Sequence, residues 1–152
     1  MQKHIGRYCY YLDSQTPTGD DNIPIYGIFE VKFSKKLHLY ITNGKACRDV
    51  ALNDIRGEWT SNYCLINEDK DVFFIVVEMI PGSPFETEGE GGYQSYIHLY
   101  RKENDYWHGS FQDNKFNKCR QGKIVIYKLK NNESTTSEFP KLKSKLLSTA
   151  AQ

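Results

Sequence analysis

Short stretches in which apolar and polar side chains alternate residue by residue constrain this chain more than any other feature. Phe29 and Val31, for example, alternate with Glu30 and Lys32. A period of two is typical of β-strands that bury one face. The pattern recurs between turn-forming Gly, Asn and Asp residues, and it predicts eight strands, at Ile5–Tyr11, Ile25–Phe33, Leu37–Asn43, Arg56–Leu65, Val72–Ile80, Tyr93–Tyr100, Asp105–Asp113 and Gly122–Leu129.

Two of these strands carry specific expectations about burial. Leu37, Leu39 and Ile41 alternate with polar or aromatic residues, so we expect these three aliphatic side chains to face the core. The strand Val72–Ile80 is apolar on both faces apart from Glu78. It should therefore be the most enclosed strand, or one whose outer face is covered by something else.

Eight short strands joined by polar turns fit one all-β domain over residues 1–130. We expect a small antiparallel eight-stranded β-barrel with a lipocalin-like meander, because closure leaves no exposed sheet edge. A β-sandwich is the alternative. The remaining residues, 131–152, form a polar tail that we expect to be flexible. Its apolar residues fall at helical spacing, so a short amphipathic helix docked on the barrel or on a partner is the other reading: Phe139, Leu142, Leu146 and Leu147.

Charge and hydropathy exclude several partners. The 20 basic and 19 acidic residues nearly cancel, which disfavours duplex nucleic acid. The longest apolar run, Val72–Val77, is far shorter than the roughly 20 residues of a membrane helix, so we expect no membrane span. The N-terminus has no secretory pattern, and the four cysteines form no Cys-x-x-Cys pair, which together predict a cytoplasmic protein with free thiols.

No catalytic motif is present. The chain lacks phosphate-loop, dinucleotide-binding, nucleophile-elbow and His-Glu-x-x-His patterns. The spacing of the four histidines does not demand a metal. We therefore expect a protein that is not an enzyme and that uses no cofactor or metal.

The aromatic residues are the more informative chemistry, with 11 Tyr, 8 Phe and 2 Trp. Tyrosine offers a flat ring and a hydrogen-bonding tip, which suits planar polar ligands. Five tyrosines fall on the less apolar side of their strands and could form one surface or line one mouth of the barrel: Tyr8, Tyr10, Tyr40, Tyr96 and Tyr100.

Two segments each place a tryptophan two residues from a glycine, Arg56-Gly57-Glu58-Trp59-Thr60-Ser61 and Tyr106-Trp107-His108-Gly109-Ser110-Phe111. The glycine lets the indole lie across neighbouring backbone. Arginine beside aromatic rings is also the minimal set for a base plus a phosphate, so several of these residues could meet at one end of the barrel. The candidate ligand-binding residues are Arg56, Trp59, Ser61, Tyr96, His98, Trp107, His108 and Arg120.

Taken in order, the segments resemble the β-barrel sensor domain of bacterial antiphage (CBASS-type) membrane effectors, which are gated by cyclic oligonucleotides. The matching stretches are Gly6-Arg7-Tyr8, the Arg56 to Ser61 segment, Val72–Ile80, the segment from Tyr106 to Asp113, and Gln121-Gly122-Lys123-Ile124-Val125-Ile126. The resemblance implies an eight-stranded barrel that binds a cyclic di- or trinucleotide. The effectors carry two membrane helices before the barrel, and this sequence has none.

Three functions follow as hypotheses. The first is a non-catalytic barrel that senses or sequesters a small nucleotide-like ligand in antiphage defence, with bases stacked on aromatic rings and phosphates on Arg or Lys. The second is a lipocalin-like carrier of a small apolar ligand. The third is a protein-interaction module, such as an immunity or inhibitor protein, which would use the acidic loop at 81–92 or the C-terminal tail.

Overall fold

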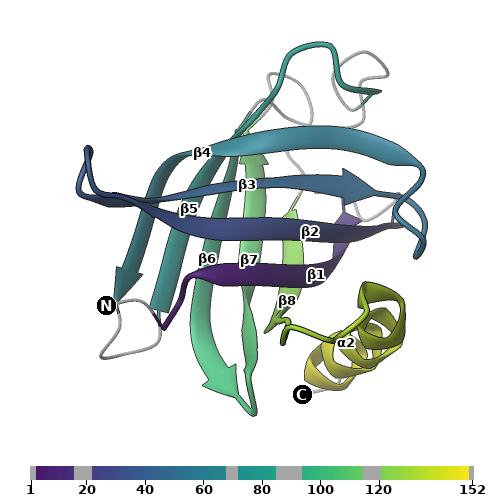
Figure 1. The fold of residues 1–152 in the computed structure, drawn as a ribbon. Coiled ribbons are helices and arrows are strands. Elements are labelled where there is room, and N and C mark those ends of the chain that lie inside the picture. The colour runs from purple at the N-terminus through teal and green to yellow at the C-terminus, as the bar shows by residue number, and fades with distance from the viewer. Residues whose placement is uncertain (1–2, 16–21, 68–71, 85–93, 115–120, 151–152) are drawn as a thin grey trace.

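The chain folds into a closed antiparallel β-barrel in which each strand pairs with its neighbours in sequence and the last pairs with the first (Figure 1). The structure is a computed structural model, and it describes residues 3–15, 22–67, 72–84, 94–114 and 121–150. The strands are β1 (Gly6–Gln15), β2 (Asn22–Ser34), β3 (Leu39–Cys47), β4 (Ile55–Asn67), β5 (Val72–Met79), β6 (Gln94–Glu103), β7 (Tyr106–Asn114) and β8 (Gln121–Lys128). The predicted eight-stranded barrel is thus confirmed, and the sandwich alternative is not.

Large aromatic rings fill the barrel interior. Tyr8 lies flat against Phe29, with ring centroids 4.9 Å apart, and Phe73 stacks on Trp107 at 5.3 Å. The ring of Trp59 contacts Phe29 at a centroid distance of 5.7 Å. Such pairs add about 0.5–1.5 kcal/mol each beyond the area they bury. The barrel is therefore held from inside by a connected set of rings.

Gly44 on β3 makes room for two of these rings. A Cβ atom at Gly44 would lie 2.6 Å from Cζ2 of Trp59 and 2.6 Å from Cβ of Phe29. The glycine against which Trp59 packs therefore belongs to the neighbouring strand rather than to its own segment. The prediction had assigned this role to the glycine two residues from each tryptophan, whereas Gly109 packs against the backbone of His98 and Leu99.

The orientation predicted for β3 is wrong. Leu37 and Leu39 are exposed, whereas Tyr40 packs against the interior cluster and Thr42 is buried. Apolar character misled the assignment because the inward positions of β3 carry Tyr, Thr, Gly and Ala, small or amphipathic residues that leave space for the rings opposite them. Tyr8 and Tyr10 also point into the barrel, so the five tyrosines do not share one surface.

The C-terminal segment is not the flexible tail that we expected. Helix α2 (Thr135–Ala150) lies against the outside of the barrel over β1 and β8 (Figure 1). Its side chains Phe139, Leu142 and Leu146 are buried against Cys9, Tyr11, Val125, Tyr127 and Leu129. The alternative of a docked amphipathic helix was correct, because β1 and β8 carry an outward apolar face that needs a cover.

This helix also explains why Val72–Ile80 is not the most enclosed strand. The outward side chains Val72, Phe74 and Val76 of β5 are only half-buried. In β8, by contrast, both the inward and the outward side chains are buried from Ile124 to Tyr127. The second layer covers β8 rather than β5, so enclosure follows the position of α2.

Candidate functional site

Polar and aromatic side chains form two rows across the outer face of β6, β7 and β8. The strand pairing places His98 opposite Ser110 and Ser110 opposite Lys123. Two residues away along each strand, Tyr96 lies opposite Gln112, and Gln112 lies opposite Gln121. Alternate residues of a strand share a face, so all six side chains project from the same side of the sheet. We call this six-residue surface the platform.

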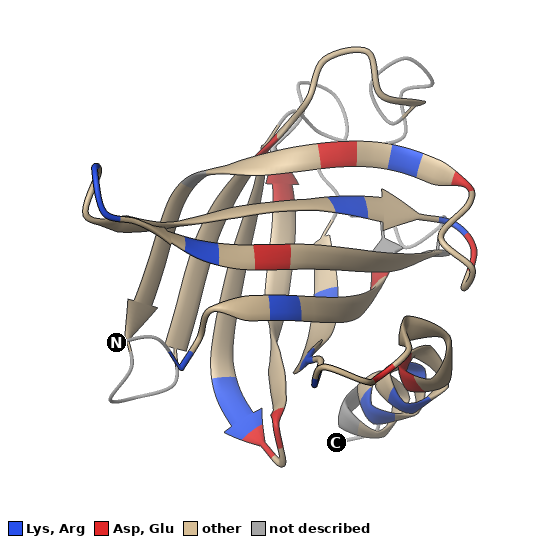
Figure 2. Ribbon diagram, viewed as in Figure 1, with Lys and Arg blue, Asp and Glu red and all other residues tan. Residues whose placement is uncertain are grey.

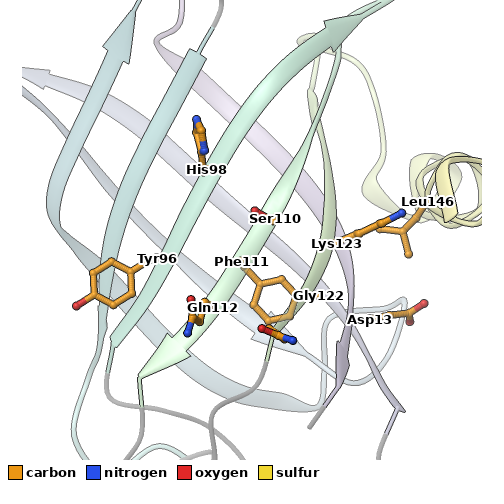
Figure 3. A pocket seen from close by; sticks show the side chains of 10 residues that line it. Asp13, Tyr96, His98, Ser110, Phe111, Gln112, Gly122, Lys123 and Leu146 are labelled. Carbon is orange, nitrogen blue, oxygen red and sulfur yellow. The ribbon is translucent and has the colours of Figure 1, made fainter. Parts of the chain in front are cut away.

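The platform lines a pocket of about 570 Å³ whose remaining walls are Asp13, Phe111, Gly122 and Leu146 (Figure 3). Leu146 comes from α2, so the docked helix supplies one wall of the pocket. Figure 3 shows Lys123 extending toward Leu146, while Tyr96 lies at the opposite side of the view. The pocket is therefore apolar and charged at the helix side, where Asp13 lies with Lys123 and Leu146, and aromatic at the β6 side.

Two glycines let the strands close beneath this pocket. A Cβ atom at Gly109 would collide with the carbonyl oxygen of His98, and one at Gly122 would collide with that of Asp13. The added Cβ at Gly122 would also lie 3.0 Å from the ring of Phe111. Any side chain there would force the backbones apart, so these glycines fix the spacing of the strands that carry the platform.

Two of the predicted site residues, Tyr96 and His98, belong to the platform. Tyr96 is 38 % exposed and His98 is also exposed, so both rings have a face available to a ligand. Neighbouring rings hold His98, which packs edge-on against Phe74 at 6.3 Å and Tyr100 at 5.6 Å between centroids. These contacts orient the imidazole without covering it.

Both tryptophans lie inside the barrel rather than at a binding surface. Trp59 is 3 % exposed and Trp107 is 2 % exposed. The indole nitrogen of Trp59 donates a hydrogen bond to the hydroxyl of Tyr10 at 3.2 Å. Neither ring offers a free face on which a base could stack, because the inward side of an eight-stranded barrel is just large enough for side chains.

The structure does not bring Arg56 and Ser61 to the platform either, since β5 separates their strand from β6. The hydroxyl oxygen of Ser61 accepts a hydrogen bond from the backbone N–H of Thr42 at 2.8 Å, next to an irregularity in the β4–β5 pairing. The Arg56 guanidinium lies 3.6 Å from the carboxylate of Asp54. Both side chains therefore make contacts with nearby residues, away from the platform. Arg120 lies outside the described residues.

His108 is buried on β7, beside the strand that α2 covers. It is paired with Val125, which the helix covers, and its Nε2 lies 4.0 Å from the carboxylate of Glu103. Burial and the positive charges of Arg101 and Lys145 lower the pKa of His108, against the opposing effect of Glu103. The predicted meeting of Arg56, Trp59, Ser61 and His108 at one end of the barrel is therefore wrong.

The described part of the chain shows no cluster suited to a metal ion, and two of its cysteines are deeply buried. Groups of three or more His, Cys, Asp or Glu residues that could hold a metal ion do not occur there. Burial raises the pKa of Cys9 and of Cys64 to about 12, so both thiols stay protonated and weakly nucleophilic. The platform, in contrast, can stack, hydrogen-bond and carry one positive charge.

Sequence reasoning missed four platform residues: Ser110, Gln112, Gln121 and Lys123. Their period-two spacing within β7 and β8 was visible, and it predicts that each pair shares a face. Only the register between strands, which the sequence does not specify, places the two pairs beside Tyr96 and His98.

Comparisons with known proteins leave the family of the chain open. No family model, no curated protein and no solved structure matches it. Within the described residues, the structure contains no helix of the length and apolar character that a membrane span requires. The resemblance to cyclic-oligonucleotide sensor barrels, and a cytoplasmic location, accordingly stay predictions.

Proposed function

We propose that the protein is a non-catalytic binding protein whose platform takes a small nucleotide-like ligand. A nucleobase would stack on the exposed ring of Tyr96 or His98, and the ammonium group of Lys123 would face a phosphate. Flat sheets that present aromatic side chains are a common surface for unstacked bases. A cyclic di- or trinucleotide is the specific ligand that the sequence resemblance implies, and antiphage defence is the role that goes with it.

One observation carries this proposal: the strand register places rings, amides and a lysine side by side over one pocket. The amides of Gln112 and Gln121 offer donors and acceptors for the edge of a base. Asp13 lies on the helix side of the pocket with Lys123 and Leu146, where its carboxylate adds an acceptor (Figure 3). The β6 side of the pocket thus offers rings, and the helix side offers a lysine beside a carboxylate.

The packed interior weighs against a carrier of apolar ligands. Such a carrier needs an open apolar cavity, whereas in the described part of the barrel the rings of Tyr8, Phe29, Trp59, Phe73 and Trp107 contact one another. Opening space among them would break these contacts, so this function would need a large rearrangement.

A protein-interaction role is the second candidate, and an apolar patch favours it. Tyr63 and Leu65 on β4 and Tyr100 on β6 are each more than half exposed, and Phe74 lies half-buried between their strands. Clusters of exposed apolar side chains often mark interaction sites. Most of the loop at 81–92 that was also expected to bind partners lies outside the described residues.

Thermal unfolding with added ligands tests the proposal. We expect mononucleotides or cyclic dinucleotides to raise the melting temperature, since a ligand at 100 times its dissociation constant adds about 2.7 kcal/mol of stability. Fatty acids should leave the melting temperature unchanged. If only fatty acids raise the melting temperature, the protein is better explained as a carrier of apolar ligands. If none of these ligands raises it, the protein-interaction role is favoured.

Matched variants connect the response to the platform. Tyr96→Ala should abolish the nucleotide-dependent shift, because stacking contributes about 1–3 kcal/mol per base. Tyr63→Ala removes a tyrosine that is 52 % exposed on another part of the outer surface, and it should preserve the shift. Equal losses in both variants would show that the platform is not the site.

A further inference from the structure

A second pocket, of about 450 Å³, opens at the end of the barrel away from Gln112 and Gln121. Its walls include four lysines, Lys3, Lys102, Lys128 and Lys130, and a single carboxylate, Asp105. Figure 2 shows basic segments at the end of β6 and after β8 on the same side of the barrel. We call this pocket the lysine mouth.

Two of the lysines, Lys102 and Lys128, have side-chain contacts that hold them at the opening. Lys102 lies just before the tight β6–β7 turn, in which Asn104 and Asp105 both have positive φ, and its Nζ sits 5.0 Å from the ring centroid of Trp107. The ammonium group of Lys128 donates a hydrogen bond to the carbonyl oxygen of Lys3. A turn and a hydrogen bond therefore bring the two side chains into the same opening.

The N-terminal segment is anchored beside them. The hydroxyl of Tyr8 donates a hydrogen bond to the carbonyl oxygen of His4 at 2.6 Å. The His4 ring is buried edge-on against Phe73, with centroids 5.0 Å apart, and closes the barrel beneath the pocket. Lys3 is thereby fixed at the rim by its neighbour in sequence.

The positive charges of Lys102 and Lys128 are poorly compensated, whereas Lys130 interacts with the carboxylate of Glu133. Among the described residues, no carboxylate forms an ion pair with Lys102 or Lys128. Desolvation, and then the charge of Lys102, lower the pKa of Lys128. Bringing like charges together costs free energy unless an anion offsets it.

A hydrogen-bond donor without an acceptor also lies close to this pocket. The indole N–H of Trp107 is buried, and it reaches no acceptor in the part of the chain that the structure describes. Buried donors are normally paired, and leaving one unpaired costs free energy. This donor lies behind the wall of the mouth, beside the ring that Lys102 covers.

We propose that the lysine mouth binds a small anion carrying two or more phosphate groups. Several ammonium groups around one hollow can contact separate phosphates at once, which a monophosphate cannot exploit as fully. The anion can be free in solution or part of a lipid headgroup, and both present the same chemistry. This site is distinct from the platform, so it stands whether or not the platform binds nucleotides.

Calorimetric titration with inorganic pyrophosphate tests the site in the full chain. We expect binding by the wild-type protein, and affinity weaker by about tenfold or more in Lys102→Met/Lys128→Met, since a charge-assisted hydrogen bond contributes about 1.5–3 kcal/mol. The control Lys35→Met/Lys36→Met makes the same charge change on the exposed β2–β3 turn and should bind like the wild type. Tyr96→Ala should also bind pyrophosphate normally.

Titrations with two further ligands distinguish the possible sources of the anion. Inorganic phosphate should bind more weakly than pyrophosphate, and vesicles containing a phosphoinositide identify a lipid source if they bind in a lysine-dependent way. If the double variant has a lowered melting temperature, pyrophosphate binding is measured with Lys130→Met instead, because Lys130 is exposed. The proposal is overturned if neither pyrophosphate nor the vesicles bind, or if the control double variant loses as much affinity as the variant of the mouth.

Discussion

The indole N–H of Trp59 donates a hydrogen bond to the hydroxyl of Tyr10 inside the barrel, across 3.2 Å. The Tyr10 hydroxyl in turn donates to the carbonyl oxygen of Lys45 at 3.1 Å. Desolvation raises the pKa of Tyr10 well above its usual range, so the phenol stays neutral at all ordinary pH values. This short chain of hydrogen bonds joins β1, β3 and β4 through side chains.

Replacing Tyr10 with Phe should lower the free energy of unfolding by about 1–3 kcal/mol, because the Trp59 N–H is left buried without an acceptor. Urea denaturation measures the change. Tyr100→Phe removes a hydroxyl from a side chain that is 54 % exposed and should have almost no effect. Equal stability of Tyr10→Phe and the wild type would mean that the hydrogen bond contributes nothing to the fold.

The docking of α2 makes a second prediction about stability. Leu142→Ala removes a fully buried side chain between the helix and β1–β8, and it should cost about 2–5 kcal/mol. Leu147→Ala alters a neighbouring leucine that is 55 % exposed and should change stability by less than about 0.5 kcal/mol. If the two variants unfold at the same urea concentration, α2 is not part of the cooperative unit.

His108 should make stability depend on pH. Burial lowers its folded pKa below the ordinary value of 6.5, so the fold favours the neutral imidazole. The stability it contributes is present above about pH 6.5 and is lost as the pH falls through the lower folded pKa. We therefore expect the urea midpoint of the wild type to drop between about pH 7.5 and about pH 5.

The variant His108→Gln should flatten this part of the pH profile. A titration of the imidazole carbon-bound protons by NMR gives the folded pKa directly. A folded pKa above 6.5 would contradict the burial described for this residue and reverse the sign of the effect.

The buried thiols should resist modification in the folded protein. Burial raises the pKa of Cys47 to about 11, and that of Cys9 and Cys64 to about 12. A thiol reagent at about pH 8 should therefore label these three cysteines only after denaturant is added. Peptide mass spectrometry distinguishes them from Cys119, and rapid labelling of Cys9 in native buffer would show that α2 leaves the barrel readily.

The fold was largely predictable because strand periodicity and turn residues act locally. The predictions that failed concerned which face of a strand points into the barrel. On β3 the inward residues are Tyr40, Thr42 and Ala46, less apolar than the outward Leu39 and Ile41, because the inward positions must leave room for rings from other strands. Hydrophobicity alone cannot report that requirement.

The candidate site was predictable only in part, for a similar reason. Tyr96 and His98 were found because exposed rings at alternate positions of one strand are visible in the sequence. Trp59 and Trp107 were misplaced because the same indole that suits a base also suits a barrel core. The lysine mouth joins residues from the N-terminus, β6 and β8, and only barrel closure makes them neighbours.

The central claim is that nucleotide-like ligands bind to the outer face of β6–β8. Amide chemical shifts recorded during titration with mononucleotides and cyclic dinucleotides test it most directly. The account predicts saturable shifts centred on Tyr96, His98, Ser110, Gln112 and Lys123, and their loss in Tyr96→Ala. Saturable shifts centred elsewhere on the barrel, or no shift at millimolar ligand, would contradict it.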